Sequence, residues 1–130
     1  MLLLDTHVVL WLALEPGKIS RKAKSAIETA RQNNDGLALC DISLVEITSL
    51  HRKGRIQLNA GLEVFLTEIE ARFIVRPISA RACARSIALP VNYPQDPADR
   101  IIGATALVEG LTLLTADDGI RRSKVVPTLW

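Results

Sequence analysis

The sequence is poor in aromatic residues, has two cysteines, and has no hydrophobic run long enough to cross a membrane. Aromatic residues make up 4% of the chain, which argues against a platform on which nucleic-acid bases stack. Cys40 and Cys83 lie far apart without CxxC spacing, so we expect small buried hydrophobic residues, not a disulfide or a zinc site. Asp5 and His7 interrupt the first apolar run, which excludes a signal peptide and predicts a soluble, cytoplasmic protein.

Several well-known α/β sites are excluded because their characteristic residues are absent. Dinucleotide and nucleoside-triphosphate sites need a glycine-rich turn after the first strand, and the segment Asp5 to Val8 contains no glycine. A phosphatase of the haloacid dehalogenase type needs a second aspartate two residues after the first, where His7 stands. A phospho-receiver domain needs an acidic pair at the first strand and a lysine after a late strand, and neither is present.

Short apolar runs alternate with helical segments along all 130 residues, which is typical of βα units in a single domain. We therefore predict an α/β fold: a three-layer α/β/α sandwich with a short, mainly parallel central sheet, formed by residues 1–130 as one domain. The predicted strands are 1–4, 37–40, 73–76, 111–115 and 125–126. The predicted helices are 6–14, 20–33, 43–52, 59–71, 79–89 and 97–109.

Four acidic residues lie at predicted strand ends or in the helix turns that face them: Asp5, Glu46, Asp99 and Asp117. Each has an ordinary alternative role, which for Asp99 is that of an acid near a helix start that pairs with Arg100 or faces solvent. Asp5 could cap the helix that starts at Thr6, Glu46 could form a capping box with Ser43, and Asp117 could be a turn residue. Asp96 before Pro97 is the better helix cap of its segment, which leaves Asp99 without a capping role.

Because ligands bind at the carboxyl ends of parallel strands, these four carboxylates are expected to meet in one crevice. They would repel each other there without a cation, so the sequence predicts a hard divalent metal ion and, with it, phosphodiester chemistry. Setting the four aside leaves 10 of the 14 acidic residues against 16 Lys and Arg, a surface suited to a polyanion. An ordinary, mildly basic protein explains that charge equally well.

Four segments resemble, in order and spacing, the signature segments of PIN-domain ribonucleases, and most closely the VapC-type toxins of toxin–antitoxin pairs: LLLDTH at 2–7, SLVEI at 43–47, DPADRII at 96–102 and LLTAD at 113–117. The resemblance covers nearly the whole chain. Its clearest departure is Ala98, which stands where the family frequently has an aromatic residue.

The resemblance implies a Mg²⁺- or Mn²⁺-dependent endoribonuclease that acts as a toxin. Asp5, Glu46 and Asp99 would be the principal metal-binding and catalytic acids, and Asp117 would bind the metal or a nearby water. Supporting roles fall to Thr6, Ser43, Thr115, Arg100 and Asp96. Ser43 and Thr115 could orient water or cap the local backbone, and Arg100 could reach a phosphate or pair with Asp96 or Asp99.

The same resemblance implies a small cognate antitoxin as partner and a homodimer. A different class of function, a catalytically inactive PIN-like module that binds RNA or protein, is the alternative. His7 and His51 have no spacing typical of a metal site, and we expect ordinary surface or hydrogen-bonded histidines there. Trp11 is expected to serve the core or a partner surface.

Overall fold

Five short parallel strands form one sheet, in the order β3-β2-β1-β4-β5, in the computed structural model, which describes residues 1–130. Every neighbouring pair is parallel. The strands are β1 (Leu2–Leu4), β2 (Leu37–Cys40), β3 (Ile74–Arg76), β4 (Thr112–Leu114) and β5 (Thr128–Leu129). A helix follows each of the first four strands, because parallel neighbours require a crossover connection.

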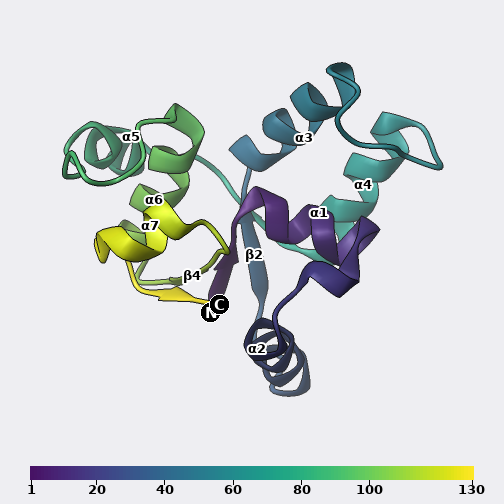
Figure 1. Cartoon of the computed structure of the whole chain (residues 1–130), viewed down its shortest axis with the longest axis horizontal. Helices are drawn as coiled ribbons and strands as arrows, with labels where there is room; N and C mark the ends of the chain where they lie inside the picture. Colours follow the sequence, from purple (N-terminus) through teal and green to yellow (C-terminus); the bar gives the residue numbers. More distant parts are fainter.

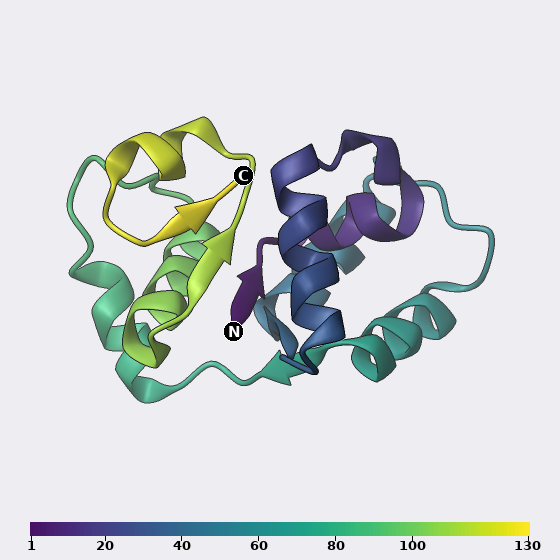
Figure 2. The same ribbon diagram turned by 90° about the horizontal axis from the view of Figure 1, so that it is seen from below.

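The helices form two layers, one on each face of the sheet, which confirms the predicted α/β/α sandwich (Figures 1 and 2). The first layer contains α1 (Thr6–Leu14), α2 (Arg21–Gln32), α3 (Ile42–Arg52) and α4 (Leu62–Arg72), with the 3₁₀ turn η1 (Pro16–Lys18) after α1. The second contains α6 (Pro97–Glu109) and α7 (Asp118–Ser123), with α5 (Ala80–Ile87) packed against α6. None of these helices combines the length and the apolar character that a membrane span requires.

Both faces of the central strands are buried, which explains their uninterrupted apolar sequences. Side chains alternate along a strand, so Leu4 and Leu114 pack into the core under α1 to α4, whereas Leu3 and Leu113 pack into the core under α6 and α7. All four are fully buried. The sheet therefore separates two hydrophobic cores and holds its strand ends in fixed positions.

Three local predictions were wrong. The last strand is Thr128–Leu129 and not 125–126, since Val126 is buried in the second core without joining the sheet. Residues 118–123 form the short helix α7, which was not predicted. Cys40 is buried as expected, but Cys83 is exposed on α5.

The order in which the strands are added to the sheet reverses at β1. The chain lays β2 and β3 on one side of β1, then crosses over to place β4 and β5 on the other side. The carboxyl ends of β1 and β4 are neighbours, and the backbone N–H of Asp5 donates to the carbonyl of Leu114 at 3.0 Å. Ligand sites of open α/β sheets lie at this kind of switch point.

Candidate active site

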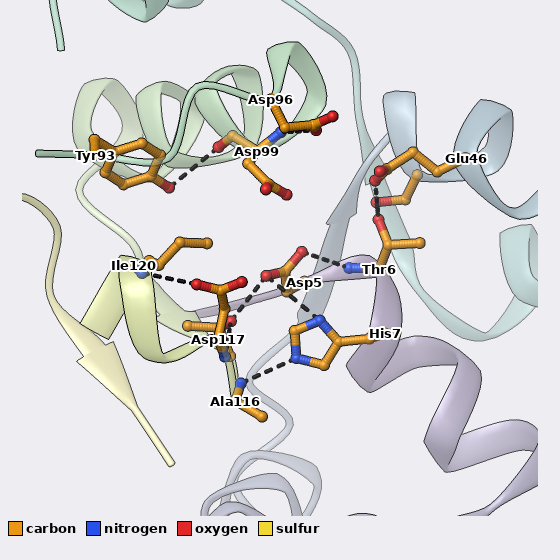
Figure 3. Close-up of polar contacts among 12 residues, drawn as sticks. Asp5, Thr6, His7, Glu46, Tyr93, Asp96, Asp99, Ala116, Asp117 and Ile120 are labelled. Atoms are coloured by element: carbon orange, nitrogen blue, oxygen red, sulfur yellow. Dashed lines mark hydrogen bonds and ion pairs between the residues drawn. The ribbon is translucent and has the colours of Figure 1, made fainter. Parts of the chain in front are cut away.

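Asp5 lies at the switch point, directly after β1, and is 3% exposed. Its Oδ1 accepts the backbone N–H of Thr6 at 2.8 Å, so it does cap α1, as its ordinary alternative predicted. Its Oδ2 accepts the hydroxyl of Thr115 at 2.8 Å. Two donors therefore hold the carboxylate in one orientation, and capping does not prevent it from facing the crevice (Figure 3).

Glu46 reaches the same region from α3. Its Oε1 accepts the hydroxyl of Thr6, and Thr6 Oγ1 lies 2.8 Å from Ser43 Oγ. Because the single Thr6 proton is given to Glu46, Ser43 must donate to Thr6. The capping box predicted as an alternative for Glu46 and Ser43 is therefore absent, and both residues are tied to the start of α1.

Asp99 lies one turn into α6, and its side chain has no hydrogen-bond partner within the chain. Asp96 caps the helix as predicted, since its Oδ2 accepts the backbone N–H of Asp99 at 3.1 Å. The hydroxyl of Tyr93 donates to the carbonyl of Asp99 at 3.1 Å, and Tyr93 packs closely against Gly103. Tyr93, which the sequence analysis did not single out, thus fixes the backbone of Asp99.

Asp117 follows β4 and caps α7, its Oδ1 accepting the backbone N–H of Ile120 at 2.8 Å. Thr115 lies beside it and is fully buried. The Thr115 hydroxyl accepts the backbone N–H of Asp117 at 3.1 Å while donating to Asp5. Thr115 therefore performs the local capping role predicted as its alternative, and in addition it links the loop after β4 to the end of β1.

The acids gather around Asp99. Figure 3 shows the carboxylates of Asp5, Asp99 and Asp117 pointing into one space, with Glu46 and Asp96 along its side. Glu46, Asp96 and Asp99 each offer an oxygen within 4.8 Å of the others. This closest group includes Asp96, which the resemblance placed among the supporting residues.

The crowding of negative charge changes the acidity of the site. Burial, followed by the charges of Asp5, Asp96, Glu46 and Asp117, raises the pKa of Asp99 to about 7. Burial is also the largest cause that raises the pKa of Glu46, opposed by its hydrogen bond from Thr6 and reinforced by Asp5 and Asp96. Burial, followed by the charges of Asp5, Asp99 and Asp117, raises the pKa of Tyr93, and the nearby Arg100 opposes this shift.

These residues fit a divalent cation of the hard, oxygen-binding kind. The donors are all carboxylates, which Mg²⁺ and Mn²⁺ prefer. The half-buried Asp99 carboxylate lacks a compensating hydrogen bond or basic partner, and the fold brings it close to other acids. A bound cation would compensate the ionised carboxylate for its burial and for the repulsion of its neighbours, the two causes that raise its pKa.

Arg100 binds the local backbone, an arrangement that neither of its two predicted roles included. Its Nη1 donates to the carbonyls of Ser86 and Leu89 at 3.0 and 3.1 Å, and its Nη2 donates to those of Pro90 and Tyr93 at 3.2 and 3.4 Å. It pairs with neither Asp96 nor Asp99. The guanidinium is occupied in holding the loop after α5 onto α6.

His7 is hydrogen-bonded, as predicted, and it also lies beside the acids of the site, which was not predicted. Its Nε2 is 3.0 Å from the backbone N of Ala116, and its Nδ1 is 3.7 Å from Asp5 Oδ2. The sequence spacing of the histidines could not predict this position, because Ala116, which His7 contacts, comes from the loop after β4. His51, by contrast, is exposed on α3, as expected.

The sequence is similar to those of known proteins. The family profile of the PIN domain matches residues 2–125. The chain is 39% identical over 119 residues to Ribonuclease VapC22 of Mycobacterium tuberculosis, covering 92% of this chain and 88% of that protein.

Solved structures show the same fold. A toxin–antitoxin complex from Klebsiella pneumoniae matches with a TM-score of 0.62 at 25% identity, over 90% of this chain and 87% of that chain. VapBC2 of Rickettsia felis, bound to a promoter DNA fragment, matches with a TM-score of 0.73 at 16% identity, over 98% and 96% of the two chains.

Proposed function

This chain belongs to the PIN-domain family, and on that premise we propose that it is a metal-dependent endoribonuclease acting as the toxin of a toxin–antitoxin pair. The observation that carries the proposal is the environment of Asp99, an unpaired carboxylate with other acids around it at the end of a parallel sheet. The identity to a VapC ribonuclease supports RNA as the substrate.

Asp5, Glu46, Asp99 and Asp117 are the proposed metal-binding and catalytic acids, and Asp96 lies close enough to join them. We propose Mg²⁺ or Mn²⁺ as the ion. Bound there, it would supply the Lewis acidity that phosphodiester hydrolysis by water requires. The chain itself supplies rigid carboxylates: Thr6 and Thr115 orient Glu46 and Asp5 before any ligand arrives.

An open groove of about 430 Å³ begins beside Glu46 and Asp96 and runs between α3 and the start of α6. Ala98 lines it, and its small side chain leaves room where the family frequently has an aromatic residue. Lys53 lies in the same groove and offers a positive charge near the acids. We propose that this groove admits the RNA strand, with Lys53 contacting its backbone.

A cleavage assay tests the nuclease proposal. The wild-type chain should cut single-stranded or structured RNA with MnCl₂ or MgCl₂ and should stop when EDTA is added. Asp99→Asn should lower the rate by a factor of about 100 or more, because it removes a charged ligand from the site. Asp35→Asn is the matched control, since Asp35 is exposed before β2, at the opposite end of the sheet. Absence of cleavage for every RNA tried would favour the alternative, a binding module.

The partner proposals follow from the same family. We propose a small antitoxin that binds this chain, a homodimer of the nuclease, a single nuclease domain over residues 1–130, and a cytoplasmic location. Expression of the chain alone should arrest growth, and Asp99→Asn should relieve the arrest. Light scattering after size exclusion measures the dimer directly, and a monomer at micromolar concentration would contradict it.

A further inference from the structure

The tautomer of His7 is determined by its contact with the backbone. The backbone N–H of Ala116 can only donate, so Nε2 of His7, 3.0 Å away, must be the unprotonated, accepting nitrogen. The proton of the neutral ring is then on Nδ1. That N–H faces Asp5 Oδ2 at 3.7 Å, a distance of electrostatic attraction and not of a full hydrogen bond.

Two tryptophans restrict the orientation of this imidazole. The ring of Trp11 lies edge-on to His7 at a centroid distance of 4.9 Å, and that of Trp130 lies at 6.5 Å. The two indoles are 5.8 Å apart. Trp130 follows β5, which pairs with β4, so the C-terminal residue is held beside the same loop that His7 contacts.

Ala116, the residue that His7 contacts, lies between two residues of the site. Ala116 separates Thr115, which donates to Asp5, from Asp117, which points into the acidic crevice. His7 itself is two residues after Asp5. A single imidazole therefore bridges the end of β1 and the end of β4 at the point where both deliver acids (Figure 3).

We propose that His7 is a positioning residue of the active site. Its Nε2 accepts from Ala116 and fixes the Thr115–Asp117 loop, and the attraction between its Nδ1–H and Asp5 favours the observed orientation of that carboxylate. The inference rests on the proposed nuclease function for its effect on cleavage. Its structural part, the tautomer and the bridge, is independent of that function. Substitution of a residue that orients a metal ligand typically lowers metal affinity or activity by a factor of about 10 to 100.

Three substitutions separate this role from simple packing. His7→Phe keeps an aromatic ring against Trp11 and Trp130 but removes both polar contacts. His7→Gln places an oxygen near the position of Nε2, so it can still accept from Ala116. His7→Asn places an amide N–H near the position of Nδ1, so it can face only Asp5. His51→Phe is the matched control, an exposed histidine on α3.

Three measurements on the full chain apply to each variant: thermal melting, calorimetric titration with MnCl₂, and steady-state cleavage of a labelled RNA. We expect His7→Phe to fold, to bind Mn²⁺ about 10-fold more weakly or worse, and to lose kcat with little change in KM. His7→Gln should retain more Mn²⁺ affinity and a higher kcat than His7→Asn, because it keeps the 3.0 Å contact with Ala116, which is stronger than the 3.7 Å contact with Asp5. Nitrogen-15 NMR of the wild-type imidazole in EDTA should show the proton on Nδ1.

A proton on Nε2 would overturn the proposal, and so would wild-type Mn²⁺ affinity in His7→Phe. If His7→Phe fails to fold, the comparison of His7→Gln with His7→Asn decides, and equal loss in both would contradict the bridge. A wild-type chain that binds Mn²⁺ but cuts no RNA would refute the nuclease function alone. The NMR and titration results would still decide the role of His7.

Discussion

Thr115 and Asp5 are separated by 110 positions in the sequence, yet the hydroxyl of Thr115 donates to Asp5 Oδ2 at 2.8 Å. The contact exists because β4 pairs directly with β1, so the residues that follow the two strands are neighbours. The same hydroxyl accepts the backbone N–H of Asp117. One buried side chain therefore connects two acids of the proposed metal site.

Thr115→Val should damage both the site and the fold. Valine has the same shape but leaves Asp5 without one donor and the Asp117 N–H without its acceptor, at a cost of about 1–3 kcal/mol. Metal affinity or kcat should fall by a factor of about 10 or more. Thr67→Val is the control, since Thr67 donates only to the Glu63 carbonyl on the exposed side of α4. Urea unfolding and the cleavage assay measure the two effects, and wild-type values in both would contradict this role.

The stability of the metal-free chain should fall as pH rises from about 4 to about 7. Asp99 has a pKa of about 7 when folded, against 3.8 as an ordinary aspartate, so the folded state binds more protons across that interval. Stabilisation from protonated Asp99 is complete below pH 4 and is lost as the pH passes 7. The raised pKa of Glu46 acts in the same direction.

Thermal melts in EDTA between pH 5 and pH 8 measure this effect. Asp99→Asn should melt well above wild type at pH 8 and by a clearly smaller margin at pH 5, whereas Asp35→Asn should follow wild type throughout. Saturating MnCl₂ should raise the melting temperature of wild type at pH 8 more than that of Asp99→Asn, because the ion binds the ionised carboxylate. A constant difference between wild type and Asp99→Asn across pH would contradict the assigned pKa.

Gly103→Ala should destabilise the chain through Tyr93. A Cβ at residue 103 would lie 2.6 Å from Tyr93 Cζ and would collide with the hydroxyl, so the ring must move. Overpacking of this kind costs about 1–3 kcal/mol. The shift should also disturb Asp99, whose carbonyl accepts the Tyr93 hydroxyl.

A double-mutant cycle checks the assignment. Tyr93→Phe removes the colliding hydroxyl, so Gly103→Ala should cost less in that background than in wild type. Gly17→Ala is the matched control, because no atom lies within 4 Å of the added Cβ at Gly17. Additive losses in the cycle would show that Gly103 is small for another reason.

The strand ends were predictable because short apolar runs followed by an acid are a local pattern, and parallel topology brings such ends together. The contact of His7 with Ala116 was not predictable, since a backbone N–H 109 positions away leaves no mark on the sequence. Helix α7 has six residues, too few to show helical periodicity, and its cap, Asp117, resembles a turn residue.

The hydrogen bonds of Arg100 were not predictable for a related reason: its four partners are carbonyls, which every residue has. We therefore predict that Arg100→Lys lowers the free energy of unfolding and leaves the cleavage rate nearly unchanged. A lysine ammonium cannot span the four carbonyls that the planar guanidinium reaches, so we expect a loss of about 2 kcal/mol. The kcat of the folded variant should stay within about 3-fold of wild type, because Arg100 contacts no acid of the site.

Arg85→Lys provides the control, since Arg85 is exposed on α5 and should tolerate the change. Melting curves and cleavage rates at a temperature below both transitions separate stability from activity. Arg100→Lys with an unchanged melting temperature and a cleavage rate lowered 10-fold or more would return Arg100 to the role of a phosphate contact. Because the loop after α5 depends on Arg100, its amide protons near Leu89 should also exchange faster in Arg100→Lys than in Arg85→Lys.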